Sequence, residues 1–238
     1  MYYSHQTLRI AIYAVALLFS RNLIALTENE RGQNGQSSPK ALFEAVGRGE
    51  TAIVESALAE HADPNLQYTD GETLVMRAIN KDRGAVVRLL ISRGADVNKP
   101  DSFGCTPLMH AVSGDNDKIV SFLLTSGARV GDRAGGRFGR GDQLTALHYA
   151  CLYGTAPIVK LLLSHGADVK MLDSFGSSPL HYSAERSDPQ ITLLLLKKGA
   201  DVKLKNKGGH TPLDLAKNRA VSAILKAHAK KHPQNRKS

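Results

Sequence analysis

The feature that most constrains the fold is a sequence period of 33 residues. Two eight-residue stretches, DSFGCTPL from Asp101 and DSFGSSPL from Asp173, are nearly identical and start 72 positions apart. Equivalent stretches begin with gaps of 33, 33, 39, 33 and 33 at Lys40-Ala41, Thr73-Leu74, Thr106-Pro107, Thr145-Ala146, Ser178-Pro179 and Thr211-Pro212. A fixed period of this length is typical of repeat architectures, in which each unit is stabilised by stacking on its neighbours.

Each unit predicts two helices followed by a projecting turn. Thr or Ser before Pro favours a helix start, because the hydroxyl caps free N–H groups and Pro lacks only a donor that would be unpaired. A second stretch, such as Ile158 to Leu163, is apolar nearly all round and must be covered on several sides. A Gly such as Gly94 can end this helix in the left-handed conformation, and turn residues follow it. The expected fold class is all-α.

These residues resemble the ankyrin repeat, whose Gly-x-Thr-Pro-Leu-His-x-Ala motif is matched by Gly104 to Ala111, Leu144 to Ala150 and Gly176 to Ser183. The resemblance implies an ankyrin-repeat solenoid of helix-turn-helix units with projecting β-turn or hairpin fingers. We expect five repeats and a C-terminal cap over residues 40–230. Ankyrin stacks are binding scaffolds, so the resemblance also implies a non-catalytic protein–protein interaction scaffold that binds a protein partner through its concave finger/helix face.

By register, the expected contacts lie on the fingers and at the ends of the first helices. The predicted protein-binding residues are Asp70, Glu72, Asn80, Lys81, Phe103, Arg137, Phe138, Arg140, Tyr153, Phe175, Arg186, Lys207 and His210. The aromatic members of this set would anchor a partner, since aromatic side chains carry a large share of interface energy. The alternative is that each Phe packs on the next helix and takes no part in recognition.

An insertion near residues 131–141 lengthens the finger between the third and fourth units. Its Gly-Gly-Arg-Phe-Gly-Arg-Gly stretch resembles segments that bind nucleic acid by charge and stacking. There is a single copy, however, and two Asp offset two of the four Arg in residues 129–143, which favours a lengthened finger tip on the binding face. Arg133, Arg137, Phe138 and Arg140 are then candidates for contacting an acidic protein partner.

The net charge of +9 is concentrated at the C-terminal end of the chain. Residues 197–238 carry twelve Lys and Arg against two Asp, a balance of +10, so the rest of the chain sums to −1. Residues 231–238 form a basic tail, which we interpret as the solvated end of a capping helix. Attraction to nucleic acid or to an anionic surface is the alternative for this tail.

The N-terminal segment resembles a secretory signal peptide. Arg9 precedes an apolar run from Ile10 to Phe19, which is too short to span a bilayer as a helix. We therefore predict a signal peptide over residues 1–27, a flexible linker over residues 28–39, and a secreted or periplasmic protein. A membrane anchor or a cytoplasmic protein is the alternative.

The remaining reactive side chains are interpreted as structural. His148 and His181 occupy the same place in adjacent units, where the resemblance implies hydrogen bonds to nearby backbone. Cys151 is expected to be buried, and Cys105, beside a finger turn, to be a partly exposed thiol. No catalytic constellation or metal-ligand spacing is found, so we expect no enzyme, cofactor, metal site or small-molecule substrate, and a monomer. A regulatory subunit that masks an enzyme remains an alternative role.

The signal-peptide prediction is tested by the intact mass of the protein purified from its native host, fraction by fraction. Export predicts a mass that lacks about twenty to twenty-seven N-terminal residues in the exported fraction, because a signal peptide is removed from the mature protein. A full-length mass in the soluble cytosol would contradict this prediction.

Overall fold

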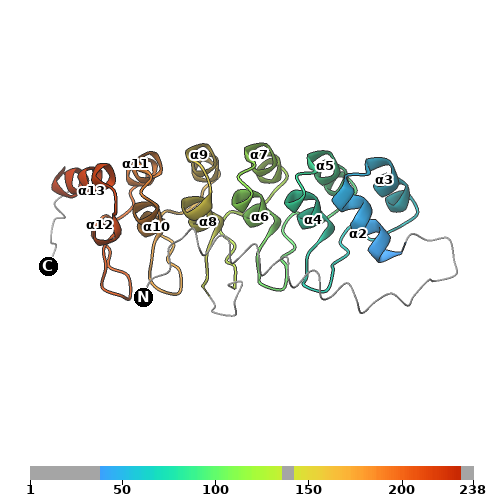
Figure 1. Ribbon diagram of the computed structural model, residues 1–238, viewed down its shortest axis with the longest axis horizontal. Helices are drawn as coiled ribbons and strands as arrows, with labels where there is room; N and C mark the ends of the chain where they lie inside the picture. Colours follow the sequence, from blue (N-terminus) through green and yellow to red (C-terminus); the bar gives the residue numbers. More distant parts are fainter. Residues whose placement is uncertain (1–37, 136–141, 232–238) are drawn as a thin grey trace. The chain divides into compact units, whose positions relative to one another are not determined.

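The computed structural model describes residues 38–135 and 142–231 (Figure 1). Residue contacts divide the chain into two units, Met1–Ser38 and Pro39–Ser238, and the second contains all the described helices. The predicted signal peptide, most of the linker and residues 232–238 of the basic tail lie outside the described residues. Arg137, Phe138 and Arg140 lie outside them as well.

The described part of the second unit is all-α, as predicted. Its helices are α2 (Pro39–Arg48), α3 (Thr51–Ala59), α4 (Leu74–Asn80), α5 (Gly84–Ser92), α6 (Pro107–Ser113), α7 (Asp117–Thr125), α8 (Ala146–Tyr153), α9 (Ala156–Ser164), α10 (Pro179–Arg186), α11 (Pro189–Lys197), α12 (Pro212–Leu215) and α13 (Arg219–Lys231). Among these residues, β-structure is limited to two isolated antiparallel bridges, Gln67 with Thr73 and Ala134 with Leu144. Both bridges lie in the fingers between helix pairs.

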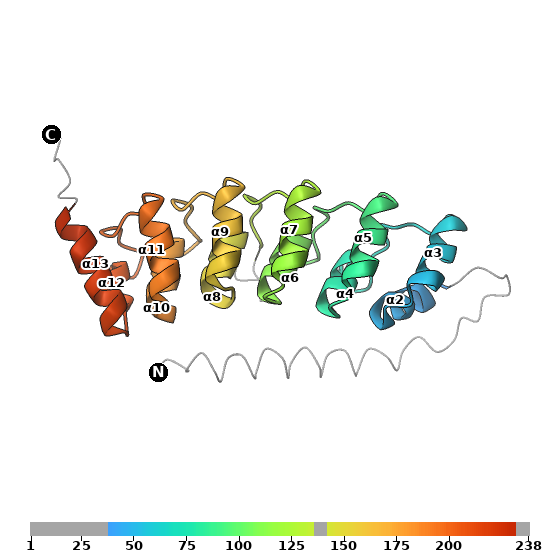
Figure 2. The same ribbon diagram turned by 90° about the horizontal axis from the view of Figure 1, so that it is seen from above.

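The helices form two layers (Figures 1 and 2). In the first layer α2, α4, α6, α8, α10 and α12 lie side by side, each in contact with the next. The second layer holds α3, α5, α7, α9, α11 and α13, and each of its helices packs on the first-layer helix that precedes it in the chain. Consecutive units therefore stack in chain order, which is the predicted solenoid.

The first-layer helices begin where the sequence predicts. The hydroxyl of Thr73 accepts the N–H of Met76 at 3.1 Å, and Thr106 caps its own helix in the same way. The small residue in the middle of each first-layer helix from α2 to α10, such as Ala111 or Ser183, is buried against its neighbours. Close stacking in the first layer follows from this small size.

The second-layer helices also contribute large apolar side chains to the core. Leu90, Leu123, Leu162 and Leu195 are fully buried, and they belong to one apolar cluster that runs through the stack. Burial of this kind stabilises each helix by roughly 1.5–3 kcal/mol per large side chain. Because each unit supplies only part of the cover, the core depends on neighbours being in place.

His148 and His181 link neighbouring units, as the resemblance implies. The backbone N–H of Thr145 donates to Nδ1 of His148 at 3.2 Å, and Nε2 of His148 lies 3.3 Å from the carbonyl of Ser177 in the next unit. His181 repeats this arrangement, with Nε2 lying 3.1 Å from the carbonyl of His210. A neutral ring with its proton on Nε2 satisfies both contacts. Burial lowers the pKa of His148 to about 4 and also lowers the pKa of His181.

These two buried histidines predict a loss of stability in mild acid. The unfolded chain takes up a proton near pH 6.5, whereas folded His148 stays neutral down to about pH 4, so the free energy of unfolding decreases as the pH falls between these values. We expect His148 alone to account for about 3 kcal/mol of the difference between about pH 7 and pH 4. His148→Gln should flatten the dependence by that amount in urea titrations, although the variant starts from a lower stability. His165→Gln, at an exposed histidine, is the matched control; an unchanged slope in His148→Gln would contradict the prediction.

Candidate functional site

The repeated DSFG stretch forms a turn built around its aspartate. In the first copy, Oδ1 of Asp101 accepts the backbone N–H groups of Phe103 and Cys105, both at 2.9 Å. In the second copy, Oδ1 of Asp173 accepts those of Phe175 and Ser177 at 2.8 and 2.7 Å. Two donors on one carboxylate oxygen fix the backbone of the finger. This gives a physical reason for the near-identical sequences of the two stretches.

The glycine of each DSFG turn is required by its backbone conformation. Gly104 has a φ of +76° and Gly176 a φ of +73°, in the left-handed region that favours glycine. A Cβ on Gly104 would also lie 2.8 Å from the backbone nitrogen of Gly135 in the next finger. The turn and the approach of the neighbouring finger therefore both need glycine at this position.

Backbone hydrogen bonds join successive fingers. The carbonyl of Phe103 accepts the N–H of Gly135, and the carbonyl of Phe175 accepts the N–H of Lys207, both at 2.8 Å. The N–H of Ser102 donates to the carbonyl of Asp70 in the preceding finger at 3.2 Å. The described fingers thus form a continuous surface. We call the described finger residues (67–72, 101–104, 131–135, 142–143, 173–176 and 205–210), together with the C-terminal ends of the first-layer helices, the finger face.

The second oxygen of each turn aspartate binds a first-layer helix. Nε2 of His110 lies 3.0 Å from Oδ2 of Asp101, and the hydroxyl of Tyr182 donates to Oδ2 of Asp173. The sequence prediction missed both partners. Their signal was the register, because His110 and Tyr182 each stand four positions after the capping Thr106 or Ser178, one helical turn from the cap.

Two predicted contact residues, Glu72 and Asn80, belong to a polar network on the N-terminal half of the finger face. Nδ1 of His110 lies 3.1 Å from Oδ1 of Asn80, whose amide donates to Oε1 of Glu72 at 2.9 Å. Burial raises the pKa of Glu72, which also lies 3.6 Å from the guanidinium of Arg77. Glu72 and Asn80 are therefore held in place by neighbours. Asn80 is exposed, as are Asp70 and Lys81 beside it.

The three predicted aromatic anchors lie in different environments. Phe175 is 51% exposed at the tip of its finger. Phe103, in the equivalent turn, is half-buried and packs against the apolar cluster. Tyr153 is half-buried, with its ring centroid 6.3 Å from that of Tyr149. Phe103 thus packs on the core, as the alternative interpretation expects, whereas Phe175 is exposed.

The basic predicted contacts near Phe175 are exposed. Arg186, Lys207 and His210 all lie at the surface, and Nη1 of Arg186 donates to the carbonyl of Gly154 at 2.5 Å. This bond holds the Arg186 guanidinium against the end of α8 in the preceding unit. Phe175 and these three side chains therefore share the C-terminal part of the finger face.

The described base of the inserted finger is tied to the following unit. Nη1 of Arg133 donates to the carbonyl of Leu172 at 2.8 Å, and Ala134 is buried where it bridges with Leu144. At least one N–H group of the Arg133 guanidinium is thus engaged in an intramolecular hydrogen bond.

The prediction of a partly exposed Cys105 is wrong. Its side chain is buried, and Sγ lies 3.5 Å from the hydroxyl of Tyr149 in the next unit. Sequence register placed Cys105 beside a turn but did not show that the stacked neighbour covers it. Cys151 is fully buried, as predicted, and burial raises the pKa of its thiol.

The described residues also bear on metal binding and on membrane insertion. Within residues 38–135 and 142–231, no three His, Cys, Asp or Glu side chains come together in a way that could hold a metal ion. In the same ranges, every helix is too short or too polar to cross a bilayer.

Comparison with known proteins agrees with this geometry. A family model described as ankyrin repeats (3 copies) matches residues 42–134 and 135–206. Among solved structures, a chain in the complex of the predatory endopeptidase Bd0816 from Bdellovibrio bacteriovorus with immunity protein Bd3460 is 28% identical, with a TM-score of 0.71. The match covers 79% of the present chain and 97% of that chain. No curated protein matches the chain. Since the family model matches well over half of its length, the chain belongs to the ankyrin repeat family.

Proposed function

We propose that this protein is a non-catalytic scaffold that binds a protein partner through the finger face, the concave face of an ankyrin stack. The ankyrin repeat is generally a non-catalytic interaction module, and a chain of similar fold occurs in a complex of two proteins. The observation that carries the proposal is Phe175, a large apolar side chain left 51% exposed on a turn whose backbone is fixed on two sides.

The rigidity of this turn favours binding. A partner that covers Phe175 gains apolar burial without having to order the finger, because the Asp173 carboxylate and the Lys207 N–H already hold it. Exposed aromatic and Arg side chains carry much of the energy of protein interfaces. Phe175 and Arg186 are accordingly the expected centre of contact, with Lys207 and His210 at its edge.

Phe175→Ala should affect mainly binding and Phe103→Ala mainly stability, although the two residues occupy equivalent turns. Phe175→Ala should weaken partner binding about ten-fold or more while changing the free energy of unfolding by less than about 0.5 kcal/mol, because the side chain is exposed. Phe103→Ala should lower that free energy by about 2 kcal/mol, because it removes packing against the core. Binding to the partner captured from the native host is measured by interferometry, and stability by urea titration.

Ile53→Ala is the matched control, since Ile53 is a 51% exposed apolar residue on α3, away from the fingers. Equal loss of binding in Ile53→Ala and Phe175→Ala would contradict the assignment of the finger face. Nucleic-acid binding makes a different prediction. Binding should weaken steeply as salt is added, and deletion of residues 131–141 and 232–238 should abolish it.

A narrower role, as a regulatory subunit that masks an enzyme, is favoured by one comparison. The similar solved chain lies in a complex of an endopeptidase with an immunity protein. We propose as a second candidate that the partner is itself an enzyme, such as a peptidase, and that the chain is exported with it. If so, stoichiometric addition of the wild-type chain should inhibit the partner's peptidase activity, and Phe175→Ala should require about ten-fold more protein. A partner without hydrolytic activity, or one whose activity is unchanged on binding, would contradict this role.

A further inference from the structure

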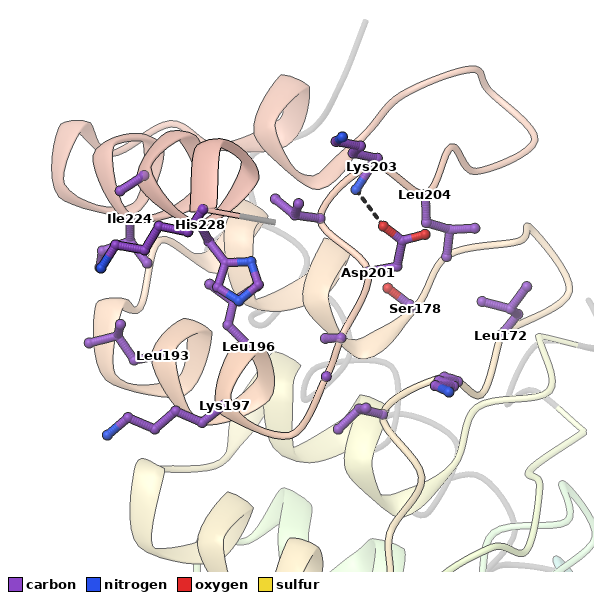
Figure 3. A pocket seen from close by; sticks show the side chains of 17 residues that line it. Leu172, Ser178, Leu193, Leu196, Lys197, Asp201, Lys203, Leu204, Ile224 and His228 are labelled. Atoms are coloured by element: carbon purple, nitrogen blue, oxygen red, sulfur yellow. Dashed lines mark hydrogen bonds between the residues drawn. The ribbon is translucent and has the colours of Figure 1, made fainter. Parts of the chain in front are cut away.

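A groove of about 1030 Å³ lies at the junction of the fifth helix pair and the last one (Figure 3). It is formed by α11 and α13 of the second layer together with the connecting segments 169–172 and 199–204. None of the predicted contact residues of the finger face lines it. The groove is therefore a surface distinct from the one proposed above.

The floor of the groove is apolar. Its leucine-sized lining side chains are Leu172, Leu193, Leu196, Leu204 and Ile224. Leu193 is 42% exposed, and an apolar residue is unusual at this place in the repeat. The equivalent positions of the three preceding second-layer helices hold Arg88, Ser121 and Lys160. A position that is polar in three units thus carries an exposed leucine in the unit that forms the groove.

The rim of the groove is basic. Lys170, Lys197, Lys203 and Lys231 all line it and are exposed. Within the described residues, no carboxylate forms an ion pair with these four ammonium groups. Asp201 is the one acidic residue of the lining, and its Oδ1 already accepts the backbone N–H of Lys203 at 2.8 Å (Figure 3).

Lys170 stands where two earlier units carry an asparagine that bridges neighbouring units. Asn98 stands 72 positions before Lys170, and its side chain bridges two units, donating to the carbonyl of Gly127 at 3.1 Å and accepting the N–H of Arg129 at 2.8 Å. Asn65 makes the same bridge one unit earlier. Lysine has no acceptor with which to reproduce this bridge, so Lys170 leaves the segment from Gly199 onward without an amide clamp from the preceding unit.

We propose that this groove binds an acidic, leucine-containing segment of a protein partner in extended conformation. In an extended chain, alternate side chains point to opposite sides, so one row can reach the apolar floor while acidic neighbours remain close to the lysine rim. Four rim lysines that form no ion pair with any described carboxylate supply the charge complementarity that selects an acidic segment. The open floor around Leu193 suits a peptide that lies along the groove.

The test uses the full chain and a fluorescein-labelled peptide of about twelve residues that alternates Leu with Asp. Fluorescence anisotropy should show binding that weakens as salt is added. The double variant Lys197→Glu/Lys231→Glu should weaken it about ten-fold or more, and Leu193→Ser about five-fold. Peptides with Lys in place of Asp, or with Ser in place of Leu, should not bind. Phe175→Ala should leave the affinity unchanged, which separates this groove from the finger face.

Lys226→Glu is the matched control, because Lys226 is exposed on α13 but does not line the groove. Unchanged thermal melting of each variant shows that the fold is retained. The proposal is overturned if Lys226→Glu weakens binding as much as the double variant does, or if no binding is seen at about 1 mM peptide. It is also overturned if the groove variants instead abolish cosedimentation with phosphatidylglycerol vesicles or self-association of the chain, either of which would identify a different occupant.

Discussion

The contact between neighbouring helix pairs is the interaction on which the rest of this structure depends. A single pair leaves apolar side chains of both helices uncovered, and the next pair completes their burial. His148 and His181 add a polar link to the same interface, since each ring satisfies a helix start in its own unit and a carbonyl in the next. Stability is therefore shared between units and is sensitive to the charge state of these rings.

The same stacking builds the surface that we propose for recognition. Once the helix pairs are in register, the fingers lie close enough for backbone hydrogen bonds between them. Each DSFG turn is held by its own aspartate and by a backbone hydrogen bond to the next finger. Rigid fingers present side chains without a large ordering cost. The finger face is thus a consequence of the packing of the core.

Much of the fold could be predicted from the sequence, because helix starts, the buried small residues and the period are local or regularly spaced features. The environments of Phe103 and Phe175 could not, since both stand in DSFG turns with nearly the same neighbours in sequence. Their difference in exposure depends on surroundings that only the stacked structure supplies. The burial of Cys105 under Tyr149 of the next unit was missed for the same reason.

Hydrogen exchange of the chain, alone and with the partner captured from its native host, tests the central claim most directly. We expect amide exchange to slow at residues 101–104, 173–176 and 205–210 on binding, because a partner on the finger face shields these turns and reduces their opening. Protection confined to the second-layer helices, with the fingers exchanging as in the free chain, would contradict the claim that the fingers bind the partner.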